Sequence, residues 1–180
     1  MVLFRLSVSR AFFFTLSANL LFLTGASSLW GAPPLSAELL SAKGQKLKGK
    51  FTFKETGKDV EITGKVEGLT PGGKHGLHIH ENAKNEPCRG DFTSVGGHFN
   101  PDAKPHGSPE KASEVHLGDL GNLEANAKGV AMFKLTRAGL KLSGPGSIKG
   151  RALIVHAKAD DFKTQPTGGA GDRIGCAIIQ

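Results

Sequence analysis

Short segments in which apolar and polar residues alternate, separated by glycine-rich turns, limit this chain to a fold built from β-strands. The 180 residues include 25 glycines, and patterns with the apolar period of a helix are scarce. Strands are predicted over residues 47–54, 60–66, 76–80, 129–135, 150–156 and 174–179. Many short strands without a helix of note predict an antiparallel β-sandwich or barrel.

Two stretches have no such alternation. Residues 82–111 are rich in proline, glycine, aspartate and lysine, and residues 160–172 contain the pair Gly168-Gly169. A loop as long as the first is uncommon in a compact domain unless it is functional. Because it carries histidines, we expect a bound metal to order it.

All seven histidines lie between His75 and His156. His78 and His80 share one face of a predicted strand, because side chains repeat every two residues along a strand. The others with ligand-like surroundings are His98, His106, His116 and His156, and Asp119 follows His116 by three residues. Neutral imidazole suits zinc and copper, and a carboxylate fits a zinc site. This number of ligand-type side chains predicts more than one metal ion.

The first residues have the pattern of a secretory signal peptide. Arg5 and Arg10 precede a mostly apolar run over residues 11–23, and small residues follow it. A membrane anchor is the alternative, but the run is shorter than the ~20 residues that a spanning helix needs. We therefore predict a signal peptide over residues 1–26, a flexible lead over 27–37, one domain over 38–180, and no stable membrane anchor.

The exported part is basic. Without residues 1–26 it keeps 21 basic and 16 acidic residues, a formal charge of +5 instead of +7. Such a charge favours anionic partners. The basic residues are not interleaved with aromatic ones and no nucleic-acid motif is present, so we expect no nucleic-acid partner.

The two cysteines, Cys88 and Cys176, both fall in the exported part. In an oxidising compartment their default state is one disulfide. It would close a loop of roughly ninety residues and stabilise the fold by roughly 4 kcal/mol. Two free or metal-bound thiols are the alternative.

Five segments together resemble the copper/zinc superoxide dismutase family, and the resemblance runs from about Glu38 to the C-terminus. They are His75-Gly-Leu-His-Ile-His80, Gly96-Gly-His-Phe-Asn-Pro101, His116-Leu-Gly-Asp-Leu-Gly-Asn122, Arg151-Ala-Leu-Ile-Val-His156 and Gly169-Ala-Gly-Asp-Arg-Ile-Gly-Cys176. The resemblance implies an all-β Greek-key barrel or sandwich, for which this family is a known example. About eight antiparallel strands, a long metal-binding loop and a shorter electrostatic loop are expected.

The resemblance also implies a ligand set. Copper would be bound by His78, His80, His98 and His156, and zinc by His98, His106, His116 and Asp119, so that His98 bridges both ions. Asp160 would link a copper histidine to a zinc histidine, with a simple Asx turn as the alternative. His75, three residues before His78, is expected to be a hydrogen-bonding residue rather than a ligand. Cys88 and Cys176 match the family's disulfide.

The implied activity is dismutation of superoxide to oxygen and hydrogen peroxide. One copper per subunit would cycle between Cu(II) and Cu(I), His98 would take up and return a proton, and one zinc would be structural. Arg173 would hold the superoxide anion; the alternative is a solvated arginine in a glycine-rich turn. Lys158 and Lys163 are candidates for steering the anion, or plain surface lysines.

Some features depart from the eukaryotic pattern. The short loop between His156 and Arg173 resembles bacterial members and predicts a bacterial periplasmic protein. Residues 81–90 match neither branch closely. Bacterial and eukaryotic members pair through different surfaces, so both a homodimer and a monomer stay open. The alternative function is a non-catalytic exported domain that binds copper and zinc, as a buffer or for delivery. Retention of every ligand and of Arg173 favours the enzyme.

Overall fold

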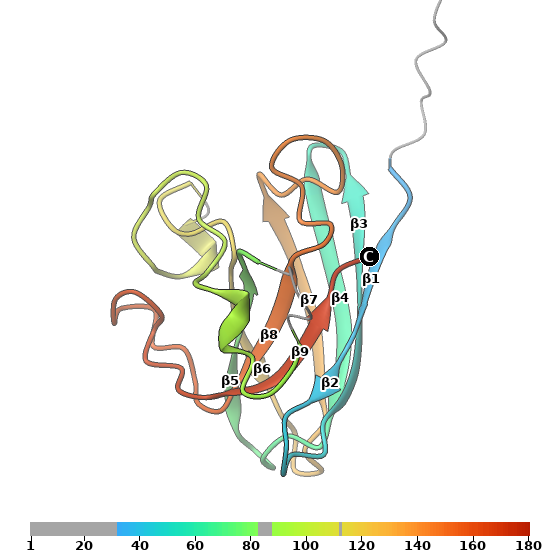
Figure 1. Ribbon diagram of the computed structural model, residues 1–180, viewed down its shortest axis with the longest axis vertical. Helices are drawn as coiled ribbons and strands as arrows, with labels where there is room; N and C mark the ends of the chain where they lie inside the picture. Colours follow the sequence, from blue (N-terminus) through green and yellow to red (C-terminus); the bar gives the residue numbers. More distant parts are fainter. Residues whose placement is uncertain (1–31, 83–87, 112) are drawn as a thin grey trace, which may run out of the picture.

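The computed structural model describes residues 32–82, 88–111 and 113–180, which form two antiparallel sheets (Figure 1). The four-stranded sheet has the order β1 (Leu35–Glu38), β3 (Lys48–Thr56), β4 (Asp59–Glu67), β7 (Ala131–Ala138). The five-stranded sheet has the order β2 (Leu40–Ser41), β9 (Arg173–Ile178), β8 (Ala152–His156), β5 (Lys74–His80), β6 (Asp119–Glu124). In these described ranges the only helical segments are the single 3-10 turns η1 (Thr93–Val95) and η2 (Pro109–Lys111).

The all-β prediction is confirmed, and the architecture is a sandwich. The two sheets remain separate ladders and do not close into a barrel. At one edge Ser36 and Gln180 exchange two backbone hydrogen bonds of 2.7 and 2.8 Å, which tie β1 to the C-terminus. The chain crosses between the sheets after β1, β2, β4, β6 and β7, as the strand order requires.

Six predicted strands correspond to β3, β4, β5, β7, β8 and β9, and no end differs by more than three residues. The sequence did not predict β1, β2 or β6. The predicted flexible lead over 27–37 is wrong from Leu35 onward, because Leu35 and Ala37 are buried and β1 pairs with β3. The predicted signal peptide over 1–26 lies outside the described residues. Within the described ranges no helix is long and apolar enough to cross a membrane.

The main core lies between the two sheets. Phe51, Phe53 and Ile62 point into it from the four-stranded sheet, and Leu77 and Ile79 point into it from β5. Alternation along β5 therefore turns His78 and His80 to the outer face of the five-stranded sheet.

That outer face is also buried. All the residues of β8 and the last six of β5 are buried, because the segments between β5 and β6 and between β8 and β9 lie against this side of the sandwich (Figure 1). A second apolar cluster fills part of the space; it contains Phe92, Val95, Ala152, Ile154 and Cys176. The histidines occupy the rest of this covered face.

Gly64 provides a test of the main core. It pairs with Phe51 on β3, and a Cβ atom at Gly64 would lie 2.3 Å from Cδ1 of Phe51. We expect Gly64→Ala to lower the free energy of unfolding by about 1–3 kcal/mol, since the Phe51 ring must move away from the added methyl group. Urea unfolding at fixed metal content measures this.

Phe51→Leu is the control, because the smaller side chain leaves room for the added methyl group. In a double-mutant cycle Gly64→Ala should cost less in the Phe51→Leu background. Equal costs in both backgrounds would contradict the clash.

Candidate metal centre

Four histidines meet on the outer face of the five-stranded sheet. His78 and His80 come from β5, and His156 ends the neighbouring strand β8. His98 reaches the same place because an isolated bridge pairs it with His80. All four are at most 3% exposed.

These four side chains can offer nitrogen atoms to one point. The donor atoms of His78, His80, His98 and His156 all lie within 4.8 Å of one another. The ring of His78 lies 3.9 Å from that of His98 and 4.9 Å from that of His156, measured between centroids. Four imidazoles are a donor set that suits copper, so we call these four residues the copper-type group.

A second group of donors shares His98 with the first. It consists of His98, His106, His116 and Asp119. Oδ1 of Asp119 lies 2.8, 3.0 and 3.3 Å from Nδ1 of His98, His106 and His116, respectively. A zinc ion with ligands at 2.0–2.1 Å needs donors roughly 3.3 Å apart in a tetrahedron. Three imidazoles and one carboxylate at these separations fit zinc, so we call these four residues the zinc-type group.

Unpartnered nitrogen atoms support the fit to metals. Nδ1 of His80 donates to the Gly96 carbonyl at 2.9 Å, and Nδ1 of His156 donates to the Gly171 carbonyl at 3.0 Å. Nε2 of each ring, like Nε2 of His98 and Nδ1 of His78, is buried and has no hydrogen-bond partner in the part of the chain that the structure describes. Buried polar atoms normally have partners. These four nitrogen atoms belong to side chains whose donor atoms lie close together, so their lone pairs are available to coordinate one metal ion.

Asp160 connects the two groups. Its Oδ2 accepts a 2.7 Å hydrogen bond from Nε2 of His78, and its Oδ1 accepts one of 2.9 Å from Nε2 of His106. Asn122 fixes the Asp160 backbone through two hydrogen bonds of 2.8 and 3.0 Å. A Cβ at Gly168 would lie 2.1 Å from Oδ1 of Asp160, so glycine is needed there for this close approach. Asp160 thus orients one ring of each group.

His75 lies outside both groups. Its Nδ1 donates to the carbonyl of His156 at 2.9 Å. A register shift between Gly76 and His78 interrupts the strand alternation next to it. His75 therefore supports the end of β8, where His156 is positioned.

Sequence reasoning missed two residues that hold the zinc-type group. Gln165 donates to the carbonyl of His106 and accepts from its N–H, at 2.9 and 2.8 Å. Arg137 is fully buried and donates to the carbonyl of His116 at 2.7 Å. Both bind backbone atoms of a distant segment, and no local sequence signal marks such contacts.

Arg173 begins β9 and lies beside the copper-type group. Its Nη1 donates to the Phe92 carbonyl at 2.5 Å and its Nη2 to the Gly96 carbonyl at 2.7 Å. Its positive charge contributes to lowering the pKa of His80 and of His156, after the larger effect of burial. Arg173 also lines an open hollow of about 650 Å³, together with Asp91, Thr93 and Asp172.

The disulfide Cys88–Cys176 is formed, so the alternative of two free or metal-bound thiols is excluded. It joins the segment after β5 to β9, three residues beyond Arg173. Both acceptors of the Arg173 guanidinium therefore follow a cysteine that is covalently fixed to the same strand.

Comparison with known proteins agrees with this geometry. Residues 47–179 match the family described as copper/zinc superoxide dismutase. The chain belongs to the copper/zinc superoxide dismutase family. Superoxide dismutase [Cu-Zn] 2 of Brassica juncea is 43% identical over 150 residues, which cover 79% of this chain and 94% of the relative. Superoxide dismutase [Cu-Zn] A of Xenopus laevis is 46% identical over 127 residues, which cover 67% and 80%.

A solved structure shares the fold. The crystal structure of the clock protein EA4 superposes with a TM-score of 0.72 at 35% identity, and the match covers 81% of this chain and 92% of that one.

The two donor groups of this family member differ in their protonation. Burial lowers the pKa of His78 to about 3 and that of His156 to about 4. Burial also acts to lower the pKa of His106, but its hydrogen bonds to Asp119 and Asp160 outweigh that effect and raise the pKa to about 9. At neutral pH without metal, the copper-type histidines are neutral and His106 carries a proton.

Zinc binding should therefore release about one proton from His106. We expect zinc affinity to rise about tenfold per pH unit below about pH 9 and to level off above it, because the competing proton is lost as the pH passes the pKa of His106. Isothermal titration calorimetry in buffers of different ionisation enthalpy measures the proton release. Copper binding to the zinc-free protein is the internal control: near neutral pH the histidines of this group are already neutral, and Nδ1 of His98 can keep its proton toward Asp119, so little or no proton should be released. Equal proton release by both groups would contradict the assignment.

Asp160→Asn tests the connection between the groups. The amide can still accept through one atom but cannot accept from both rings, so His106 loses an orienting charge. We expect zinc affinity to fall about 10–100-fold and its pH dependence to level off at a lower pH. Asp161→Asn is the matched control, since Asp161 accepts from exposed Lys163 and Thr164 instead. Equal losses in both variants would contradict the orienting role.

Proposed function

We propose that this chain is a copper/zinc superoxide dismutase, which converts two superoxide anions and two protons to oxygen and hydrogen peroxide. The observation that carries the proposal is the sharing of His98 between two buried donor groups of different composition. Membership of the family makes the same reaction the expected one.

In this proposal copper is held by His78, His80, His98 and His156, and zinc by His98, His106, His116 and Asp119. Two features support the division. The first group offers only imidazole nitrogens, whereas the second includes a carboxylate and has donor separations that suit a zinc tetrahedron. Bound copper would supply one-electron oxidation and reduction, and bound zinc would order the loop that carries its ligands.

His98 is proposed to move a proton. It is 3% exposed, and its Nε2 has no hydrogen-bond partner among the described residues. Nδ1 faces Asp119 at 2.8 Å, which keeps the ring oriented while Nε2 accepts a proton and returns it to the reduced substrate.

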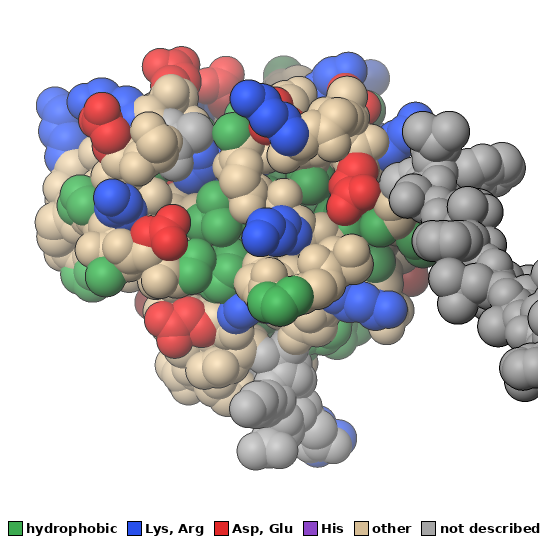
Figure 2. All heavy atoms as spheres, turned by 90° about the horizontal axis from the view of Figure 1, so that it is seen from above, with side chains coloured by type: hydrophobic (Ala, Val, Ile, Leu, Met, Phe, Trp, Pro, Cys, Tyr) green, Lys and Arg blue, Asp and Glu red, His purple; other side chains and the backbone are tan. Residues whose placement is uncertain are grey.

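Arg173 is proposed to bind the superoxide anion. Hydrogen bonds to two carbonyls fix the guanidinium, so its positive charge keeps one position beside the copper-type group. On the face seen in Figure 2, basic and acidic side chains are interspersed. We attribute anion attraction chiefly to Arg173, which lies beside the copper-type group, and we propose Lys158 and Lys163, between β8 and β9, as further contributors.

We also propose that the protein is exported, to the periplasm if the source is bacterial. The N-terminal sequence pattern supports this, as does the formed disulfide, because disulfides persist in oxidising compartments.

The direct test is superoxide consumption by the purified residues 32–180 loaded with copper and zinc. We expect fast consumption that disappears when a chelator removes copper and returns when copper is added. Pulse radiolysis or stopped flow measures the rate. Two bound metals without any consumption of superoxide would overturn the proposal and favour a metal buffer or delivery domain.

Arg173→Ala is the matched variant in the same assay. We expect the rate at low salt to fall about tenfold or more, with copper and zinc contents unchanged, because the attracting charge is lost. Lys163→Ala serves as the comparison for a general change of charge. An unchanged rate in Arg173→Ala would contradict the proposed role of Arg173 but not the proposed reaction.

A further inference from the structure

We propose that Phe92 is a positioning residue for Arg173. Its buried ring holds a turn in an unfavourable backbone conformation, and this conformation directs the Phe92 carbonyl at the guanidinium. The inference rests on the proposed function, because it assigns Arg173 to anion binding.

The two acceptors of Arg173 are not equivalent. The Gly96 carbonyl accepts from Nη2 of Arg173 and also from Nδ1 of the copper-type ligand His80. The Phe92 carbonyl accepts from Nη1 of Arg173 and, at 3.4 Å, from the N–H of Val95 in the same turn. Phe92 is therefore the anchor of Arg173 that does not depend on a metal ligand.

The backbone of Phe92 is in the left-handed region, with φ 62° and ψ 17°. This region is costly for a bulky residue with a Cβ atom and is usually occupied by glycine. Such a conformation persists only where surrounding contacts offset its cost, and it often accompanies functional sites.

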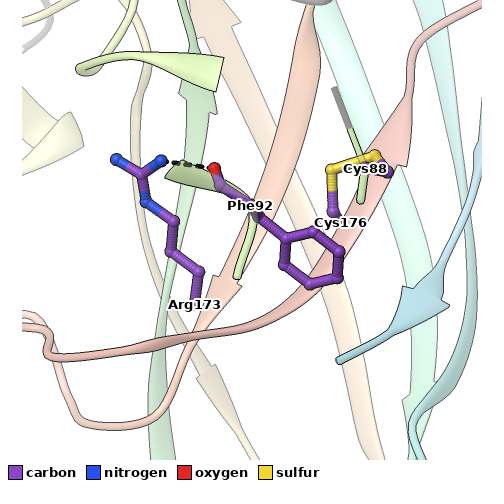
Figure 3. The surroundings of a disulfide bond; sticks show 4 residues. All are labelled: Cys88, Phe92, Arg173 and Cys176. Atoms are coloured by element: carbon purple, nitrogen blue, oxygen red, sulfur yellow. Dashed lines mark hydrogen bonds between the residues drawn. A yellow bond between two sulfur atoms is a disulfide. The ribbon is translucent and has the colours of Figure 1, made fainter. Parts of the chain in front are cut away.

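The contacts that offset it are those of the ring. Phe92 is 2% exposed and belongs to the cluster with Val95, Ala152, Ile154 and Cys176. Figure 3 shows the ring directed toward the Cys88–Cys176 disulfide and the carbonyl directed the opposite way, toward Arg173. The left-handed backbone is what allows one residue to bury its ring on β9 and to bind the guanidinium.

Neighbouring hydrogen bonds fix the turn on both sides of Phe92. Its N–H donates to the Arg89 carbonyl at 3.1 Å. Oδ1 of Asp91 accepts from the N–H and the hydroxyl of Thr93, at 3.1 and 2.8 Å. The two bonds to Asp91 shape the turn but are exposed, whereas the Phe92 ring is buried and resists rearrangement.

Three substitutions separate the ring from the backbone. Phe92→Leu keeps an apolar side chain in the cluster. Phe92→Gly removes the ring but occupies the left-handed region without cost. Phe92→Ala removes the ring and keeps that cost. Ile154→Ala is the matched control. It removes a buried side chain from the same cluster, but Ile154 is not one of the two residues whose carbonyls accept from Arg173.

The measurement is the dissociation constant of azide, a monovalent anion, for the Cu(II)- and zinc-loaded protein, followed by visible absorption. The second readout is hydrogen exchange of the Arg173 guanidinium by NMR in the diamagnetic Cu(I), zinc form. Metal content and melting temperature are recorded for every variant, and superoxide consumption is measured in parallel.

We expect Phe92→Ala to weaken azide binding about three- to tenfold and to speed exchange at Arg173. Phe92→Gly should have a smaller effect on azide, although it lacks the same ring, and Phe92→Leu should bind nearly as well as the parent. Ile154→Ala should lower the melting temperature and leave azide binding unchanged. If Phe92 has a role in packing alone, the four variants should either bind azide as the parent does or lose azide affinity in proportion to their loss of melting temperature.

Unchanged azide affinity and unchanged Arg173 exchange in folded Phe92→Ala would overturn the inference. If that variant does not fold, equal azide affinity in Phe92→Gly and in the parent, with equal exchange, would overturn it as well. In both of these cases the parent protein still consumes superoxide, so the proposed function stands. A parent with bound metals that does not consume superoxide indicates failure of the proposed function instead.

Discussion

The carboxylate of Asp160 is the interaction on which the metal centre depends. It bonds His78 from β5 and His106 from the long loop, at 2.7 and 2.9 Å. Asn122 on β6 holds its backbone, and Gly168 leaves it space. One side chain thus connects a rigid strand with a loop that has little core of its own. Since both rings donate to it through Nε2, both turn Nδ1 toward the place of a metal ion.

The same arrangement gives the two donor groups opposite electrostatic characters. The copper-type group is built from neutral rings, because burial is the main influence on the pKa of His78, His80 and His156. The zinc-type group contains Asp119, whose Oδ2 also accepts from the N–H of Gly107. Hydrogen bonds with the three histidines hold the pKa of Asp119 far below its usual range, against the effect of burial. A buried anion among the ligands favours a dication that keeps its charge, whereas neutral ligands suit an ion that changes charge.

Covalent and apolar contacts extend this order to Arg173, the residue proposed to bind the substrate. The disulfide attaches the segment after β5 to β9, and the cluster around Phe92 fills the space beneath it. Arg173 is then held between two carbonyls of that segment. The Phe92 carbonyl is one of these two acceptors, so in the proposed role of Arg173 a change at Phe92 can alter anion binding without removing a charged group.

The sequence by itself determined six of the nine described strands and the ligand-type residues, and the family resemblance implied how those residues are grouped. Alternation predicted β3, β4 and β7, and the pairs of apolar residues in these strands form the core. It did not determine β1, because Leu35 and Ala37 are buried only when β3 lies beside them. Only the tertiary structure decided that the sheets stay separate and that Gln165, Arg137 and the Phe92 carbonyl hold the site. These roles belong to backbone contacts between distant segments, which have no periodicity in the sequence and exist only once the loops are folded against the sheet.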